Sequence, residues 1–466
     1  MTVFEHIRKH KAEGNHIKAW QTGYAELGKE PNNEYLKTSL FWVIYAALKQ
    51  VIEPIQKRKN PTPLLKEQKV IDNWVEKIQL LRLSLPNDNI DYRIWNLFKI
   101  VGKHCEPLCL FILNSERRLF CESDYEPYIH EKGEAFSNVL RLSRMVAECY
   151  LMRNKESSLP VDEVIKLLDY AYSETKDNSK SKVWLEYARA KVFAEIGDMD
   201  KAKKSYLSVL KVKRTESWAW FGFGKTFRDD TKKAISIISH GLSYAHEPKF
   251  AISSLTLLSK LFSEQGDYEL ASKTLIRLSN IYKENGWNLK DSIVELMSNE
   301  WFDASLDVAD LNNQLRILAE GAVEYTVEEP VFYSAVVERV HKSGKGITAY
   351  INRFLQIPVQ KSLFKDQKLT IPGTFIKILC DKTSEELQAV SIEELVPFES
   401  EDVCCFQGKI KITNSGLGFV NDNIFVPPHL VEGITQAAEV AGVAVMSFDE
   451  KKQKHGFRAV SLKDLS

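Results

Sequence analysis

The residues that come nearest to a nucleotide-binding motif are Gly222-Phe-Gly-Lys-Thr226. A phosphate-binding loop needs a glycine-rich turn directly after a strand, because its backbone N–H groups and its lysine must reach the phosphates. Here Ala219 stands where the motif requires its first glycine, and the surrounding apolar spacing is that of a helix. We therefore interpret Gly222 as a packing glycine, placed where the two helices of one hairpin approach too closely for a side chain.

His104, Cys105, Cys109 and Cys121 are residues of the kinds that bind zinc, and they lie close together in the sequence. Structural zinc sites usually contain closely spaced pairs such as Cys-x-x-Cys, which this stretch lacks. The stretch also has helical apolar spacing, and a cysteine in a helix commonly serves as a small buried apolar residue. We therefore predict neither a metal site nor a bound cofactor.

No Gly-x-Ser-x-Gly, His-Glu-x-x-His or comparable catalytic pattern occurs in the sequence. With 63 Lys and Arg residues against 63 Asp and Glu residues, the chain has no net charge to attract it to nucleic acid or to an anionic membrane. We therefore expect a protein that is not an enzyme and in which any nucleic-acid site is local. The helical part has three basic clusters, each also typical of an exposed helix end: Lys57-Arg58-Lys59, Lys201 with Lys203 and Lys204, and Lys211 with Lys213 and Arg214.

Seven cysteines at irregular spacing argue against a disulfide framework and for a reducing compartment. The N-terminus has mixed charge and lacks the apolar run of a secretory signal. The most apolar stretch, residues 39–51, is too short to cross a bilayer of about 30 Å. We therefore expect a cytoplasmic protein that does not enter a membrane.

Apolar residues up to about residue 320 recur at three- and four-residue spacing, which predicts helices. A repeat of about 34 residues runs through this region. One copy is marked by Trp218, Phe221, Gly222 and Ala234, and the copies before and after it hold Ala190, Phe193, Gly197, Ala202 and Tyr206, and Phe262, Gly266, Ala271 and Leu275. The pattern resembles tetratricopeptide (TPR) repeats, most clearly over residues 182–280, and implies an all-α solenoid of helical hairpins across residues 1–325. Residues 36–180 have only general helical periodicity, which divergent repeats and a different helical bundle would both explain.

After about residue 323 the pattern changes to short alternating runs rich in Val, Ile, Thr and Phe, which predict strands. Residues 408–430, Gly-Lys-Ile-Lys-Ile-Thr-Asn-Ser-Gly-Leu-Gly-Phe-Val-Asn-Asp-Asn-Ile-Phe-Val-Pro-Pro-His-Leu, resemble the first half of a bacterial cold-shock domain, including versions of both its nucleic-acid-binding segments. Residues 442–448 and 456–462 resemble the last two strands of that family. The resemblance implies a small all-β OB-type barrel over residues 404–466.

Residues 331–396 repeat the same scheme in weaker form. Four segments recur in the same order: Ser343–Ile347 with Ser415–Phe419, Ile357–Val359 with Ile424–Val426, Gly373–Ile376 with Gly442–Val445, and Gln388–Ile392 with Arg458–Leu462. We infer a tandem duplication that gives two barrels joined by the acidic linker 393–402. In the first barrel we expect Ile347 and Ile357 where phenylalanine would stack, which favours a structural or supporting role. Lys345 nevertheless lies in a basic glycine-rich turn that can touch phosphates.

Cold-shock domains bind single strands by stacking bases on aromatic side chains of neighbouring strands, with basic residues following the backbone. The resemblance places Phe419 and Phe425 at two stacking positions and makes Lys409, Lys411 and Arg458 candidate phosphate contacts. Three residues of the family are replaced here: an aromatic residue by Leu417, a tryptophan-like residue by Ile412 and a histidine by Pro427. Because each stacked base contributes about 1–3 kcal/mol, we expect weaker binding than in a complete cold-shock protein.

Two functions are consistent with these features. The first is a non-catalytic adaptor that binds a protein partner through the concave surface of its array and single-stranded nucleic acid, with RNA favoured over DNA, through its barrels. The second is a pure protein-interaction scaffold whose barrels no longer bind nucleic acid. An enzyme with an unrecognised site in residues 36–180 is a third alternative. The architecture also resembles that of accessory factors of bacterial stress or defence systems, an analogy that names neither the partner nor the oligomeric state.

Overall fold

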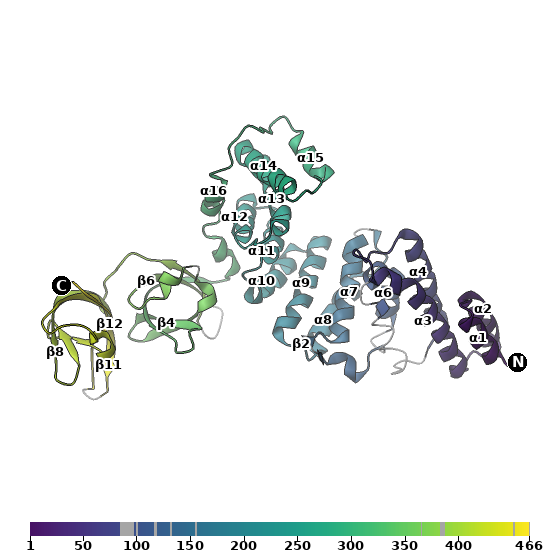
Figure 1. Cartoon of the computed structure of the whole chain (residues 1–466), viewed down its shortest axis with the longest axis horizontal. Coiled ribbons are helices and arrows are strands. Elements are labelled where there is room, and N and C mark those ends of the chain that lie inside the picture. Colours follow the sequence, from purple (N-terminus) through teal and green to yellow (C-terminus); the bar gives the residue numbers. More distant parts are fainter. Residues whose placement is uncertain are drawn as a thin grey trace. The chain divides into compact units, whose positions relative to one another are not determined.

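The computed structural model describes residues 1–83, 97–98, 101–115, 119–130, 133–153, 156–364, 366–382, 387–450 and 453–465. The chain divides into two compact units, Met1–Leu318 and Ala319–Ser466. Helices dominate the first unit and strands the second, as Figure 1 shows. The predicted fold class, an array of helical hairpins followed by two small β barrels, is confirmed.

The N-terminal part of the first unit is built from α1 (Val3–Ala12), α2 (His16–Leu27), α3 (Glu34–Gln56), α4 (Leu65–Leu80), η1 (Gly102–His104), α6 (Glu106–Asn114) and η2 (Glu122–Tyr125). Their apolar faces pack, together with those of α7 (Asn138–Arg153), α8 (Val161–Glu174) and α9 (Ser179–Ile196), into one buried core that includes Leu40, Ile44 and Val146. A short β hairpin, β1 (Tyr128–His130) and β2 (Gly133–Ala135), interrupts the helices and was not predicted. Among the described residues, no helix is both long enough and apolar enough to cross a membrane.

The following helices pair as successive hairpins: α7 (Asn138–Arg153) with α8 (Val161–Glu174), α9 (Ser179–Ile196) with α10 (Met199–Val212), α11 (Ser217–Gly224) with α12 (Thr231–Leu242), and α13 (Pro248–Glu264) with α14 (Tyr268–Glu284). The unit ends with α15 (Asp291–Met297) and α16 (Leu311–Leu318). Figure 1 shows these helices following one another along the unit.

A shared turn joins the helices of three hairpins. Gly14, Gly197 and Gly266 have φ of 74°, 86° and 78°, a left-handed conformation that a glycine adopts without the strain of a Cβ atom. The residue after each glycine then caps the next helix, since the side chains of Asn15, Asp198 and Asp267 accept a hydrogen bond from its first turn. The repeat read from the sequence therefore corresponds to a repeated helix–turn–helix structure.

Gly222 is a packing glycine, but its neighbour differs from the predicted one. A Cβ atom at Gly222 would lie 2.3 Å from the ring of Tyr206, which belongs to α10 of the preceding hairpin. The expectation of a contact within one hairpin is therefore wrong for this glycine. Within the hairpin of α11 and α12 the close approach occurs at Gly241, where a Cβ atom would lie 2.4 Å from Trp220.

Replacing Gly222 with leucine is expected to overpack the contact between α10 and α11. Tyr206 is 4% exposed and cannot move aside freely, so we expect a loss of about 1–3 kcal/mol in the free energy of unfolding. Lys225→Ala, at an exposed site three residues later, is the matched control and should change this free energy by less than about 0.5 kcal/mol. Chemical denaturation measures both variants. Equal stability of Gly222→Leu and wild type would contradict the packing role.

The first barrel contains β3 (Pro330–Val340), β4 (Gly346–Asn352), β5 (Leu355–Gln360), β6 (Phe375–Asp381) and β7 (Gln388–Glu394), preceded by η4 (Ala322–Thr326) and with η5 (Lys361–Leu363) and η6 (Gln367–Thr370) between β5 and β6. These strands form an antiparallel sheet in the order β5-β4-β3-β6-β7, and the edge strands β5 and β7 come into contact. Side chains of all five strands, with those of the flanking turns, fill the space between them.

The second barrel contains β8 (Val403–Ile412), β9 (Gly418–Val420), β10 (Ile424–Val426), α17 (Pro428–Val431), β11 (Glu439–Asp449) and β12 (Lys454–Asp464). It is closed in the order β10-β12-β11-β8-β9, with β10 and β12 parallel. The order of strands along the sheet matches that of the first barrel, and the four recurring sequence segments fall on corresponding strands. The structure thus agrees with a tandem duplication.

Ile347 and Ile357 of the first barrel do not occupy stacking positions, contrary to expectation. Both are 1% exposed and belong to the barrel core. The pair on the opposite face of these strands is Thr348 and Pro358, which lie opposite each other on β4 and β5. Pro358 is exposed, whereas Thr348 is buried beneath Arg339 and His341. Because side chains alternate between the faces of a strand, a shift of one residue moves every side chain to the other face.

The two barrels share a buried apolar contact, here called the inter-barrel cluster. Its members come from both barrels and from the linker: Val336, Tyr350, Phe375, Val403, Val443, Val445 and Val460, with Leu395 and Phe398 packed against them. The Tyr350 hydroxyl donates a hydrogen bond of 2.7 Å to the carbonyl oxygen of Met446 in the second barrel. Asp402, at the end of the linker, accepts one of 2.5 Å from Arg353. The barrels are therefore packed together and the linker is part of their interface.

Candidate nucleic-acid interface

A row of four outward-facing side chains crosses four strands of the second barrel. Lys411 on β8 lies opposite Phe419 on β9, Phe419 lies opposite Phe425 on β10, and Phe425 lies beside Arg458 on β12. We call this set the platform row. Residues directly opposite each other in neighbouring strands have Cβ atoms about 4.5–5.5 Å apart, so the row is continuous.

Phe419 and Phe425 form the centre of the platform row. Their ring centroids are 5.9 Å apart and their planes are tilted by 54°. Both side chains are half-buried, whereas their strand neighbours Val420, Ile424 and Val426 point into the barrel core. Strand alternation thus directs both rings to the outside of the barrel. Two neighbouring aromatic rings on the outside of an OB-type barrel are suited to stacking with unpaired bases.

Two of the predicted phosphate contacts, Lys409 and Lys411, lie on the outer face of β8 and are exposed. The Lys411 ammonium group is 2.6 Å from the Asp422 carboxylate, and the two side chains are 70% and 78% exposed. Such an exposed ion pair contributes about 0–1 kcal/mol, so Lys411 can exchange this partner for a phosphate at little cost. Both lysines therefore remain available to a ligand beside the two rings.

Arg458, the third predicted contact, is bound by the first barrel. Its guanidinium group forms an ion pair with Glu338 on β3, whose side chain is only 6% exposed while that of Arg458 is 33% exposed. The second carboxylate oxygen of Glu338 has no hydrogen-bond partner within the described part of the chain. Sequence reasoning missed Glu338 because the pair joins residues of two different barrels.

The remaining predicted contact and two further aromatic sites lie outside the platform row. Lys345 is exposed in the turn between β3 and β4 of the first barrel. Phe448 is 49% exposed where β11 ends, and its ring lies 5.2 Å from that of His455 across the hairpin. Phe354, between β4 and β5, is 88% exposed. Phe448 directly precedes the charged turn of the hairpin, a position from which the sequence could have suggested exposure.

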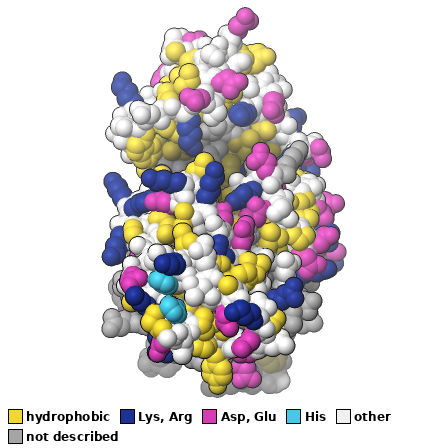
Figure 2. All heavy atoms as spheres, turned by 90° about the vertical axis from the view of Figure 1, so that its right-hand side faces the viewer, with side chains coloured by type: hydrophobic (Ala, Val, Ile, Leu, Met, Phe, Trp, Pro, Cys, Tyr) yellow, Lys and Arg dark blue, Asp and Glu magenta, His cyan; other side chains and the backbone are white. Residues whose placement is uncertain are grey.

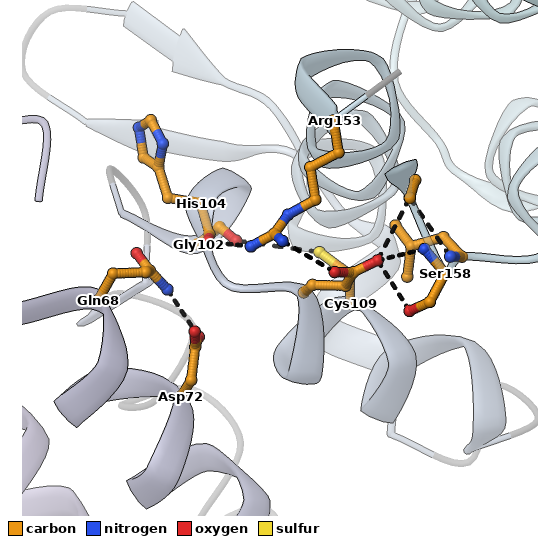
Figure 3. Close-up of polar contacts among 10 residues, drawn as sticks. Gln68, Asp72, Gly102, His104, Cys109, Arg153 and Ser158 are labelled. Carbon is orange, nitrogen blue, oxygen red and sulfur yellow. Dashed lines mark hydrogen bonds and ion pairs between the residues drawn. The ribbon is translucent and has the colours of Figure 1, made fainter. Parts of the chain in front are cut away.

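The segment that contains His104, Cys105 and Cys109 takes part in a network of polar contacts in the helical unit. Figure 3 shows Arg153 of α7 directed at the η1 and α6 segment, where it contacts the Glu106 carboxylate at 3.0 Å and the His104 carbonyl oxygen at 3.4 Å. The His104 ring points away from Cys109, whose thiol faces the Gly102 carbonyl oxygen at 3.9 Å. These contacts join α7 to the preceding segment.

Cys105 and Cys109 are buried in the helical core. Burial raises the pKa of the Cys105 thiol well above its usual value, and a hydrogen bond with Cys149, together with burial, does the same for Cys109. Among the residues that the structure describes, no group of three or more His, Cys, Asp and Glu side chains is placed to hold a metal ion.

Charge is mixed on the face of the molecule seen in Figure 2. Lys and Arg side chains alternate there with Asp and Glu, and hydrophobic side chains are scattered between them. A surface of this kind produces no strong field of one sign, so it would not steer a polyanion. On this face, a nucleic-acid contact would have to come from particular groups of residues.

Comparisons with known proteins match two segments of the chain. Residues 405–462, which carry the platform row, match the family described as S1/CSD-like domain 2 of the TOTE conflict systems. The second barrel is thus similar to a cold-shock-like domain, as its sequence predicted. Residues 183–322 match a domain of unknown function, DUF7017. A comparison with curated proteins finds no match.

One matching solved structure is a TPR domain. The crystal structure of the P58(IPK) TPR domain aligns with 68% of this chain and 97% of its own, at 12% sequence identity and a TM-score of 0.15. At that TM-score the alignment has no weight for the fold. The description of the helical unit therefore depends on its own repeated hairpins and turns.

Proposed function

We propose that this protein is a non-catalytic adaptor that holds single-stranded nucleic acid, RNA in preference to DNA, on its second barrel and a protein partner on its helical array. The observation that carries the proposal is the pair of outward-facing rings, Phe419 and Phe425, flanked by Lys411 on the neighbouring strand. Rings of this kind bind bases through their faces, and the adjacent cation follows the phosphates. The similarity of this barrel to a domain of the TOTE conflict systems supports a place in such a system.

The helical unit supports the second half of the proposal. Successive hairpins build an extended surface, and arrays of this type commonly bind peptides or folded proteins. No disulfide joins the seven cysteines, all of which lie in the described part of the chain, and this supports the reducing, cytoplasmic compartment that we propose.

A scaffold without nucleic-acid binding is the second candidate, and the contact between Arg458 and Glu338 favours it. This ion pair neutralises one of the cations beside the rings, and the inter-barrel cluster shows that the outer surface of the barrel also serves protein contacts. On this view the platform row is a docking surface for another protein.

Fluorescence anisotropy with labelled single-stranded and duplex oligonucleotides tests the proposal. We expect the full chain to bind a pyrimidine-rich single strand more tightly than a duplex, RNA more tightly than DNA of the same sequence, and with affinity that falls as salt rises. Absence of binding to any single strand at low salt would remove the adaptor function and leave the scaffold.

A further inference from the structure

The helical unit has a surface of aromatic and basic side chains that spans three successive hairpins. We call it the aromatic–basic surface and define it by Arg144 on α7, Trp184, Tyr187 and Lys191 on α9, Lys213 directly after α10, and Trp218 on α11. All six side chains are half-buried. It is separate from the platform row and belongs to the other unit of the chain.

The aromatic residues of this surface form a connected group. Trp184 and Trp218, which hold the same position in successive repeats of about 34 residues, are stacked with centroids 5.3 Å apart and planes 18° apart. Tyr187 packs its ring against Trp218 at 4.6 Å and an angle of 63°. This stacking also joins the two hairpins, so the rings are held in fixed positions.

Basic groups lie over these rings. The Arg144 guanidinium carbon is 5.2 Å from the centre of the Trp184 ring, and the Lys213 ammonium nitrogen is 5.6 Å from it. The Lys191 ammonium nitrogen is 4.6 Å from the centre of the Tyr187 ring. Cation–π contacts of this kind hold a charged group at the surface while leaving its other side open to an anion.

Positive charge is in excess here. The surface has three cations. Burial lowers the pKa of Lys191, the nearby Glu148 raises it, and Arg144 and Lys103 of η1 lower it. Burial also lowers the pKa of Arg144. Two acidic groups lie beside this surface: Glu148, 3.6 Å from Arg144, and Glu216, which accepts a hydrogen bond of 3.2 Å from Trp218. The three cations of the surface therefore outnumber these two carboxylates, and a bound polyanion would offset the excess.

We propose that the aromatic–basic surface is a second binding site for single-stranded nucleic acid, in which Arg144, Lys191 and Lys213 contact phosphates and the rings of Tyr187 and Trp218 contact bases. Rings interleaved with cations are the combination by which proteins hold single strands without sequence preference.

The same charges would attract an acidic peptide, but the neutral side chains argue against one. An extended peptide presents backbone N–H and C=O groups, which side-chain amides are well suited to bind because they both donate and accept. The stretches that form the surface, residues 141–148, 184–191 and 217–225, contain no Asn or Gln. The stacked rings, in contrast, offer flat apolar contacts suited to bases.

The test uses the full chain with Phe419→Ala and Phe425→Ala. These changes remove the stacking rings of the platform row, so that binding at the helical site is measured separately. A fluorescein-labelled oligothymidylate of about 20 nucleotides is titrated at about 50 mM salt. We expect residual, salt-dependent binding. Adding Lys191→Gln and Lys213→Gln should weaken this binding about ten-fold and lower the slope of log affinity against log salt by about 0.7 for each lost phosphate contact.

The matched control is Lys260→Gln with Lys283→Gln, two exposed lysines of α13 and α14 outside the surface. It removes the same charge and should leave the binding within about two-fold, because screening limits distant charges. Glutamine keeps the apolar stem of lysine, and circular dichroism checks that each variant is folded. Where Lys191→Gln disturbs folding, Lys213→Gln alone supplies the comparison.

Three results would overturn the proposal. One is no binding of the probe by the variant with the silenced platform row. Another is an equal loss of binding in the control variant. In the third, the chain binds a polyglutamate peptide and not the oligothymidylate, and this binding depends on Lys191 and Lys213. That result would make the surface a protein site. If the platform row does not bind nucleic acid, the test can still be done, because any binding by the wild-type chain would then come from the helical site alone.

Discussion

Replacing Phe419 and Phe425 together with alanine is expected to weaken binding of a short single-stranded oligonucleotide to the second barrel by about 2–6 kcal/mol, or about 1–3 kcal/mol for each lost stack. This corresponds to a loss of about 30-fold to about 20,000-fold in affinity. The rings face outward and the barrel core is formed by their neighbours Val420, Ile424 and Val426, so the barrel should stay folded. Anisotropy titrations of wild type and variant measure the effect, with a thermal melt of each.

Phe354→Ala is the matched control for this experiment. It removes the same kind of ring from an even more exposed position, 88% exposed in the first barrel, and should leave the affinity unchanged within about two-fold. Unchanged affinity in the Phe419 and Phe425 variant would show that bases do not stack there. A large loss of thermal stability, combined with no oligonucleotide binding by the wild type, would support the scaffold instead.

Replacing Arg458 with methionine is expected to destabilise the contact between the barrels by about 2–4 kcal/mol. The change leaves the Glu338 carboxylate without its ion-pair partner at a site that is 6% exposed. Breaking a fully buried pair costs about 3–5 kcal/mol, and we expect somewhat less because the Arg458 side chain is 33% exposed and water can reach it. Hydrogen exchange of the backbone amides in β3 and β12 measures the loss.

The double variant Glu338→Leu and Arg458→Met separates the pair from other effects of Arg458. With both charges removed, most of the lost stability should return, since an apolar pair of similar volume often replaces a buried ion pair at little cost. If the single and double variants are equally destabilised, the contribution of Arg458 lies in packing and not in its charge.

Much of the fold follows from periodicity and from the internal repeats. The change from helical to alternating spacing near residue 323 marks the change from helices to strands, and the four recurring segments fall on corresponding strands of the two barrels. The glycines at 197 and 266 were assigned to equivalent positions and have the same left-handed conformation. Such features are local in sequence, which explains why a single sequence reveals them.

The errors arose where the outcome depends on strand register or on contacts between distant segments. Ile347 was aligned with Phe419, yet it points into the core because a register difference of one residue reverses the face. Gly222 was correctly assigned to close packing, but which helix it meets depends on how hairpins stack. The partner of Arg458 lies in a different barrel, and no local pattern in the sequence points to Glu338.

The inter-barrel cluster also bears on how the duplicated halves can diverge. Once Val443, Val445 and Val460 are covered by Tyr350 and Phe375, neither copy can be deleted without leaving the other with a bare apolar patch. The first barrel is therefore needed to cover that patch, although it holds Thr348 and Pro358 where the second barrel has its two rings. A gene truncated to encode residues 403–466 alone is accordingly expected to yield an aggregating product, whereas one that begins before β3 should yield a soluble one.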